Sequence, residues 1–77
     1  MKDHDRLTKR ELEVLRFMSQ GLANKQICEK IGVGASTVKT HVINIYNKLG
    51  LSWTNEYPVK RVNAVLYYLN NKEELEK

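Results

Sequence analysis

Residues 24–49 read NKQICEKIGVGASTVKTHVINIYNKL, and this stretch decides the fold. Its pattern predicts a short helix over 24–31, a turn at 32–34 and a longer helix over 35–49. Glycine suits the turn, because it adopts the positive φ angles that other residues avoid. Apolar residues recur at helical spacing on both segments: Ile27, Cys28 and Ile31 on the first, and Val38, Val42, Ile45 and Leu49 on the second. A short helix, a tight turn and a longer helix make a helix-turn-helix.

A further helix is predicted before this motif, over 9–20. Thr8 followed by Glu11 has the spacing of a capping box, in which each side chain satisfies a backbone donor of the other residue. Apolar residues then follow at helical spacing: Val14, Leu15, Met18 and Leu22. Gly21 stops the helix in the manner of a C-terminal glycine.

A last helix is predicted over 58–70, since Pro58 suits a first helical turn. Its inner side is expected to carry Val62, Val65, Leu66 and Leu69. The loop 51–57 precedes it, and we expect its Trp53 to fold back over the core. The chain is therefore predicted to be all-α, with four helices in a single domain over 1–77 and a core within 7–70.

Length and composition exclude several function classes. A chain of 77 residues buries only about 60% of its unfolded surface, which leaves little room for an enclosed active site. We therefore expect no enzyme, no cofactor and no small-molecule ligand. His4, His41 and the lone Cys28 lack the spacing of zinc ligands, so no metal is expected. No apolar run reaches the ~18 residues of a membrane helix, so no membrane contact is expected.

Charge is unevenly distributed along the chain. The net charge is +4, yet residues 32–52 contain no acid and residues 62–77 are net acidic. Between 31 and 61 a single acid, Glu56, stands against four bases: Lys39, Lys48, Lys60 and Arg61. A basic middle and an acidic end suggest one surface that attracts phosphate.

The outer face of the helix over 35–49 is suited to DNA. With its apolar stripe turned inward, the outward residues are Ser36, Lys39, Thr40, Ile43 and Asn47. Lysine can reach guanine in the major groove, and threonine or an apolar side chain can contact the thymine methyl. The residues flanking this face are placed to meet phosphates: Thr37, His41, Asn44 and Lys48.

Three blocks of the chain resemble the LuxR/FixJ-type (GerE-like) helix-turn-helix domain. They are LTKRELEVLRFMSQG over 7–21, NKQI over 24–27 and TVKTHVINIYNKLG over 37–50. The resemblance implies a bacterial, cytoplasmic transcription regulator, associated with the nucleoid when bound, that binds double-stranded DNA as a homodimer. It implies that the recognition helix lies in the major groove.

Residue roles follow from the same resemblance. Lys39, Thr40 and Ile43 match base-contacting positions. Positions that commonly hold phosphates are matched by Lys25, Ser36, Thr37, His41 and Lys48. The last helix is expected to supply a dimer interface: Val62, Val65, Tyr68 and Leu69.

The chain departs from the family pattern at three places. Ala23 and Gly34 stand where the family often has a serine N-cap; loss of a serine cap to alanine costs about 1 kcal/mol. The family's Arg-x-x-Ala pattern occurs as Arg61-Val62-Asn63-Ala64, later in the chain than usual, behind a longer loop. That shift puts in doubt the position of the last helix and the usual dimer.

Two functions remain open on the sequence. The first is a sequence-specific DNA-binding transcription regulator. The alternative is a protein-interaction module on a helix-turn-helix scaffold that binds another regulator or RNA polymerase, since Trp53 and Tyr57 lie in the longer loop. The acid-free outer face over 35–49 favours DNA. These 77 residues hold no receiver domain or ligand pocket, so we expect either that abundance alone controls activity or that the domain is a module of a longer chain. Met1 with its polar surroundings favours a naturally short protein.

Overall fold

The computed structural model describes residues 6–76, and His4 lies outside this range. Its helices are α1 (Lys9–Ser19), α2 (Asn24–Ile31), α3 (Ala35–Lys48), α4 (Tyr57–Asn70) and α5 (Lys72–Leu75). Within 6–76 there is no strand, so the all-α prediction is confirmed. The four expected helices begin and end within a residue of their predicted bounds, and α5 is an addition. No helix in the described part of the chain is long and apolar enough to cross a membrane.

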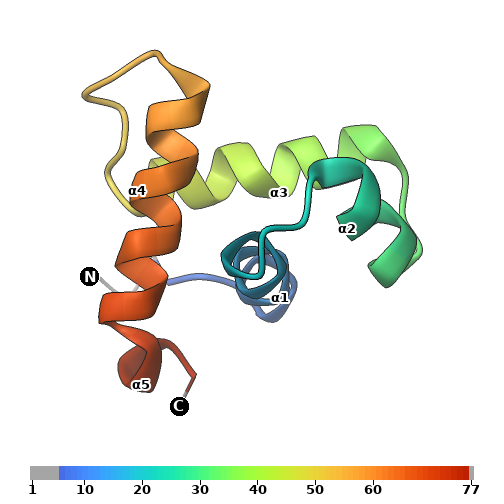
Figure 1. The fold of residues 1–77 in the computed structure, drawn as a ribbon, viewed down its shortest axis with the longest axis horizontal. Coiled ribbons are helices and arrows are strands. Elements are labelled where there is room, and N and C mark those ends of the chain that lie inside the picture. Colours follow the sequence, from blue (N-terminus) through green and yellow to red (C-terminus); the bar gives the residue numbers. More distant parts are fainter. Residues whose placement is uncertain (1–5, 77) are drawn as a thin grey trace.

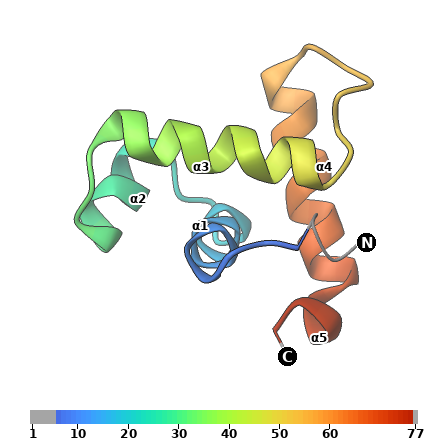
Figure 2. The same ribbon diagram turned by 180° about the vertical axis from the view of Figure 1, so that it is seen from behind.

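The helices are arranged around α1. Figure 1 views α1 almost end-on, with α3 crossing above it, α2 at one end of α3 and α4 passing the other end. Figure 2 shows the same crossing from behind. The core is built by α1, α2, α3 and α4 together with the start of the loop after α3, and it consists of Val14, Leu15, Met18, Ile27, Val38, Val42, Ile45, Tyr46, Leu51, Ala64 and Tyr68. The inward stripes predicted for the first three helices are thus largely confirmed.

The start of α1 is fixed by Glu11, which is only 4% exposed. The predicted capping box is present: Glu11 N–H donates to Thr8 Oγ1 at 3.1 Å, and Thr8 N–H donates to Glu11 Oε1 at 2.9 Å. The same carboxylate oxygen accepts a hydrogen bond from Lys48 Nζ at 2.7 Å. A buried carboxylate needs such partners, so this pair ties the start of α1 to the end of α3.

Two glycine turns set the direction of the chain at the ends of α2 and α3. Gly32 and Gly50 adopt φ angles of 71° and 72°, which side chains with a Cβ rarely adopt. In each turn the next residue donates its N–H back across the helix end, Val33 to Cys28 O at 3.3 Å and Leu51 to Tyr46 O at 2.9 Å. Val33 and Leu51 then pack on the core.

Helix α4 buries a different face from the one its apolar spacing predicts. Ala64 and Tyr68 are 0% and 1% exposed, whereas Val62, Leu66 and Leu69 are 57%, 50% and 54% exposed. The small side chain of Ala64 allows close approach of the helices. Tyr68 is buried because its hydroxyl donates a hydrogen bond to Glu76 Oε2, so its polar group has a partner. The predicted inner side was therefore wrong for Val62, Leu66 and Leu69, whereas Val65 packs against the core as expected. The assignment of Tyr68 to a dimer interface was also wrong, because its side chain is buried within the protomer.

Arg61 holds α4 in place despite the longer loop. Its guanidinium donates to Asn24 Oδ1 at 2.8 Å and to Leu22 O at 2.7 Å, which joins α4 to the start of α2. Leu51 is 7% exposed and covers the core at the beginning of the loop. The expectation that Trp53 folds back over the core was wrong, because Trp53 is 66% exposed and Leu51 is the residue of this loop that is buried.

The end of the chain is attached to α1 by an ion pair. Arg16 Nη2 lies 2.6 Å from Glu76 Oε1, and Arg16 Nε donates to Glu76 Oε2 at 2.9 Å. These hydrogen bonds from Arg16, with a further one from Tyr68, lower the pKa of Glu76 from 4.5 to about 2. Burial and the contact with Glu76 raise the pKa of Tyr68. The bidentate pair therefore fixes α5, a helix of only 4 residues, beneath α4.

The lowered pKa predicts an acid-sensitive contribution to stability. Glu76 is charged in the folded protein down to about pH 2 but protonates near 4.5 when unfolded. Its contribution is therefore complete above pH 4.5 and is lost as the pH falls toward 2. We expect Glu76→Gln to lower the free energy of unfolding at pH 7 and to flatten its pH dependence in that window. Urea unfolding across the pH series measures both effects.

Glu73→Gln is the matched control, because Glu73 is an exposed carboxylate in α5, the helix that Glu76 caps. An equal change of the pH profile in the two variants would contradict a specific role of Glu76.

Candidate nucleic-acid interface

Helix α3 presents a continuous exposed face on the side opposite the core. Val38, Val42 and Ile45 point inward at 0%, 5% and 0% exposure. The residues exposed on the other side are Ser36, Thr37, Lys39, Thr40, Ile43 and Asn47. All three predicted base-contacting residues therefore lie at the surface on one helix. Ile43, at 36% exposure, adds an apolar side chain to this face.

The chemistry of this face is small, polar and cationic. Residues 35–48 contain no carboxylate, and within 6–76 no ion pair involves Lys39. Thr40 is exposed, and its Oγ1 donates to Ser36 O at 3.0 Å, so the hydroxyl can still accept a hydrogen bond. The face can thus donate hydrogen bonds, accept them and make apolar contact, which are the three interactions that read base edges in the major groove.

The candidate phosphate-contacting residues fall into two groups around α3. Lys25, Ser36 and Thr37 are exposed at the end where α3 begins. Gly34 provides no side-chain cap there, so the first backbone N–H groups of α3 have no side-chain acceptor from it. His41 and Asn44 are half-buried on the flank of the helix. Five of the six candidates are therefore at or near the surface that surrounds the exposed face.

Lys48 is the exception among the predicted phosphate contacts. Its ammonium pairs with Glu11 Oε1, and the two side chains are only 24% and 5% exposed. A charge held by a buried carboxylate is already neutralised, so Lys48 acts in the structure as an internal cation. The two residues lie 37 positions apart, and no local signal in the sequence connects them.

The cap of α2 also differs from expectation. Ala23 has no side-chain acceptor, but Gln26 Oε1 accepts a hydrogen bond from Ala23 N–H at 2.8 Å. This bond supplies half of a capping box and partly replaces the missing serine. The beginning of the helix-turn-helix is therefore ordered without the residue that the family often uses.

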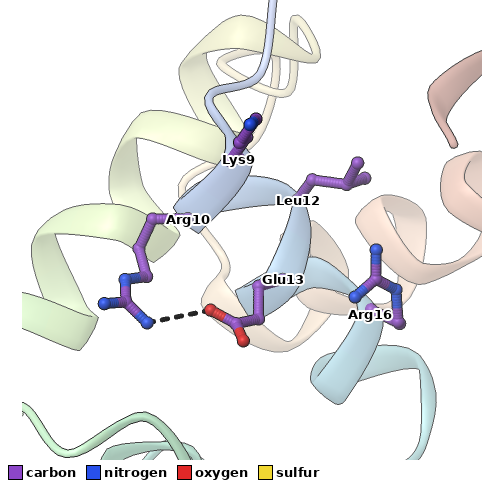
Figure 3. A pocket seen from close by; sticks show the side chains of 5 residues that line it. All are labelled: Lys9, Arg10, Leu12, Glu13 and Arg16. Carbon is purple, nitrogen blue, oxygen red and sulfur yellow. Dashed lines mark hydrogen bonds and ion pairs between the residues drawn. The ribbon is translucent and has the colours of Figure 1, made fainter. Parts of the chain in front are cut away.

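A concave feature lies on the outer side of α1. Figure 3 shows its lining, which comes from that one helix: Lys9, Arg10, Leu12, Glu13 and Arg16. Arg10 Nη1 pairs with Glu13 Oε1 at 2.9 Å, and Arg16 is bound to Glu76. No polar groups from other helices converge on this open pocket. In the part of the chain that the structure describes, no three metal-ligating side chains cluster either.

Comparison with known proteins gives the same family as the motif. The model of the family described as bacterial regulatory proteins, luxR family, matches residues 5–56. The transcriptional regulatory protein LiaR of Bacillus subtilis (strain 168) is 49% identical over 49 residues, which cover 64% of this chain and 23% of LiaR. The HTH-type transcriptional regulator MalT of Yersinia pestis (strain Pestoides F) is 44% identical over 50 residues, 65% of this chain and 6% of MalT.

The chain thus spans less than a quarter of the length of these relatives. No solved structure matches the chain.

The internal position of Lys48 predicts a loss of stability when it is removed. Lys48→Ala leaves the Glu11 carboxylate buried without its cation, and we expect the free energy of unfolding to fall by about 1–3 kcal/mol. Lys39→Ala removes an exposed lysine from the same helix and should change stability by less than about 0.5 kcal/mol. Urea unfolding of the two variants measures the difference. Equal stability of both would contradict the structural role of Lys48.

Proposed function

Since this chain belongs to the luxR family of bacterial regulatory proteins, we propose that it is a sequence-specific transcription regulator that reads double-stranded DNA. In this proposal α3 lies in the major groove. The observation that carries it is the exposed, carboxylate-free face of α3 on a helix-turn-helix whose other side is fully packed. The chain's relatives that share this segment are named as transcription regulators.

Three side chains are proposed to read bases. Lys39 would donate to the O6 and N7 atoms of a guanine, and Thr40 would bond a base edge or contact a thymine methyl. Ile43 would pack against a thymine methyl, which gives its exposed apolar surface a partner. These side chains occupy neighbouring turns of α3, so together they would contact adjacent base pairs.

The surrounding residues are proposed to hold the DNA backbone. Lys25, Ser36 and Thr37 would meet phosphates at the start of α3, where unpaired N–H groups and the helix dipole favour an anion. His41 and Asn44 would contact the strand along the flank of the helix. Such contacts fix the register of the protein on the duplex and carry no sequence information by themselves.

A homodimer is proposed to form through α4. Val62, Leu66 and Leu69 form an exposed apolar stripe on the side of α4 that faces away from the core. Val65 packs partly on the core and borders the stripe. Three large apolar side chains at helical spacing are typical of a helix that pairs with another surface. Two copies joined there would place two α3 helices on two half-sites.

A protein-interaction module is the second candidate function. Trp53 and Tyr57 are 66% and 60% exposed, and exposed aromatics often concentrate binding energy at protein interfaces. In that case the partner would be another regulator or RNA polymerase, and the face of α3 would have no role. In the favoured function the protein acts on the bacterial nucleoid in the cytoplasm. Substitutions on α3 separate the two functions.

Lys39→Ala tests the reading of bases. Duplexes recovered by selection from a random library serve as the ligand. We expect binding to weaken by about 1–3 kcal/mol and the preference at one base pair to relax. Lys25→Ala should weaken all duplexes alike and lower the slope of log K against log salt by about one. An unchanged base preference in Lys39→Ala would show that this lysine does not read a base.

Leu66→Glu tests the dimer. Leu66 is 50% exposed, so the variant should stay folded while the added charge opposes pairing of two stripes. We expect sedimentation of the protein on a selected inverted repeat to change from two protomers to one. Gln20→Glu places the same charge at an exposed position at the end of α1 and should leave two protomers on the repeat. One wild-type protomer on the inverted repeat would refute the proposed dimer.

A further inference from the structure

Three exposed or partly exposed residues beside α3 have no role in the proposed function. They are Trp53 in the loop that follows α3, and Tyr57 and Lys60 in the first turn of α4; we call them the shoulder. Trp53 and Tyr57 are 66% and 60% exposed. Trp53 is the only tryptophan of the chain, and no described contact buries its side chain.

The shoulder lies on the same side of the molecule as the exposed face of α3. In Figures 1 and 2 the loop and the first turn of α4 rise past α3, on the side away from α1. The exposed face of α3 also points away from α1, because Val38, Val42 and Ile45 pack toward it. A duplex held against α3 would therefore have the shoulder next to it.

Lys60 carries the charge of the shoulder. Its Nζ lies 5.7 Å from the centre of the Tyr57 ring and 6.0 Å from that of Tyr46, so two aromatic faces hold the ammonium. Within residues 6–76 no ion pair involves Lys60, in contrast to Lys48. The rings position the ammonium without cancelling its charge.

Tyr46 connects this charge to α3. It is a core residue of that helix, 3% exposed, near the helix's C-terminal end. Its contact with Lys60 therefore places the ammonium beside the end of the helix that carries the proposed base-contacting residues. Glu56, the N-cap of α4, is the only acid between residues 32 and 61.

We propose that the shoulder is a second DNA-contacting element, which binds the sugar–phosphate backbone next to the base pairs read by α3. Lys60 pairs with a phosphate, and Trp53 packs its ring against the adjacent sugar. This inference rests on the proposed function, since it needs a duplex on α3. It extends the contact beyond the major groove through the loop that distinguishes this chain from the family pattern.

Trp53 itself reports on the contact, because it is the only tryptophan in the chain. A selected duplex is added to the full chain while fluorescence and acrylamide quenching are followed. We expect the emission to change on binding and the ring to become protected from acrylamide. A Trp53 that stays accessible on a saturating selected duplex would overturn the proposal.

Variants then measure the two contributions on a selected duplex with and without its flanking base pairs. Trp53→Ala should lose about tenfold in affinity on the flanked duplex and little on the trimmed one. Lys60→Gln should lower the salt slope by about one on the flanked duplex. Lys72→Gln, an exposed lysine on α5, is the matched control and should keep the wild-type slope.

The outcomes separate this inference from the proposed function. The proposed DNA contact of the shoulder alone would be overturned by two results together. Trp53→Ala and Lys60→Gln would keep wild-type affinity on the flanked duplex, while Lys39→Ala would show a relaxed base preference. Absence of any duplex binding by the wild-type chain would overturn both. Protection of Trp53 by RNA polymerase, with no response to the duplex, would also overturn the shoulder and identify it as a protein contact.

Discussion

The rest of the structure depends on one buried carboxylate. Glu11 is 4% exposed, and a single oxygen accepts hydrogen bonds from the N–H of Thr8 and the ammonium of Lys48. A carboxylate in this position is tolerated only with such partners, so the arrangement that satisfies it is strongly favoured over alternatives. It fixes the crossing of α1 and α3, and this crossing decides which side of α3 faces outward. The proposed DNA contacts therefore depend on a buried residue that is not one of them.

The second fixed point is at α4. Arg61 bonds to Asn24 and to the carbonyl of Leu22, and Ala64 is fully buried. These contacts hold α4 against the start of α2 while its opposite side keeps Val62, Leu66 and Leu69 exposed. Packing and exposure are thus divided between two sides of one helix, which leaves one side for a proposed partner copy without disturbing the core.

Local signals made most of this fold predictable. The capping pair at Thr8 and the glycine turn at Gly32 act within a few residues, so they mark the helix ends in the sequence itself. The exposure of Lys39, Thr40 and Ile43 followed from the inward stripe of the same helix. Tertiary contacts were not predictable: the stripe Val62, Leu66 and Leu69 has helical spacing like that of a buried face, and only the packing of Ala64 and Tyr68 decides between them. The pairs Lys48–Glu11 and Arg16–Glu76 were not predictable either, because their partners lie far apart in the sequence and meet only in the folded chain.

Two independent contacts hold the chain on either side of the loop between α3 and α4. Leu51 is buried in the core, and Arg61 of α4 bonds to Asn24 and to the carbonyl of Leu22. Residues 52–56 between them carry no part of the core, so their number and identity are free to change while both contacts stay in place. Such a segment can evolve separately from the scaffold that carries it. Exchange of this loop between related domains, or the insertion of a peptide there, would change the surface beside α3 while the scaffold that positions α3 stays the same.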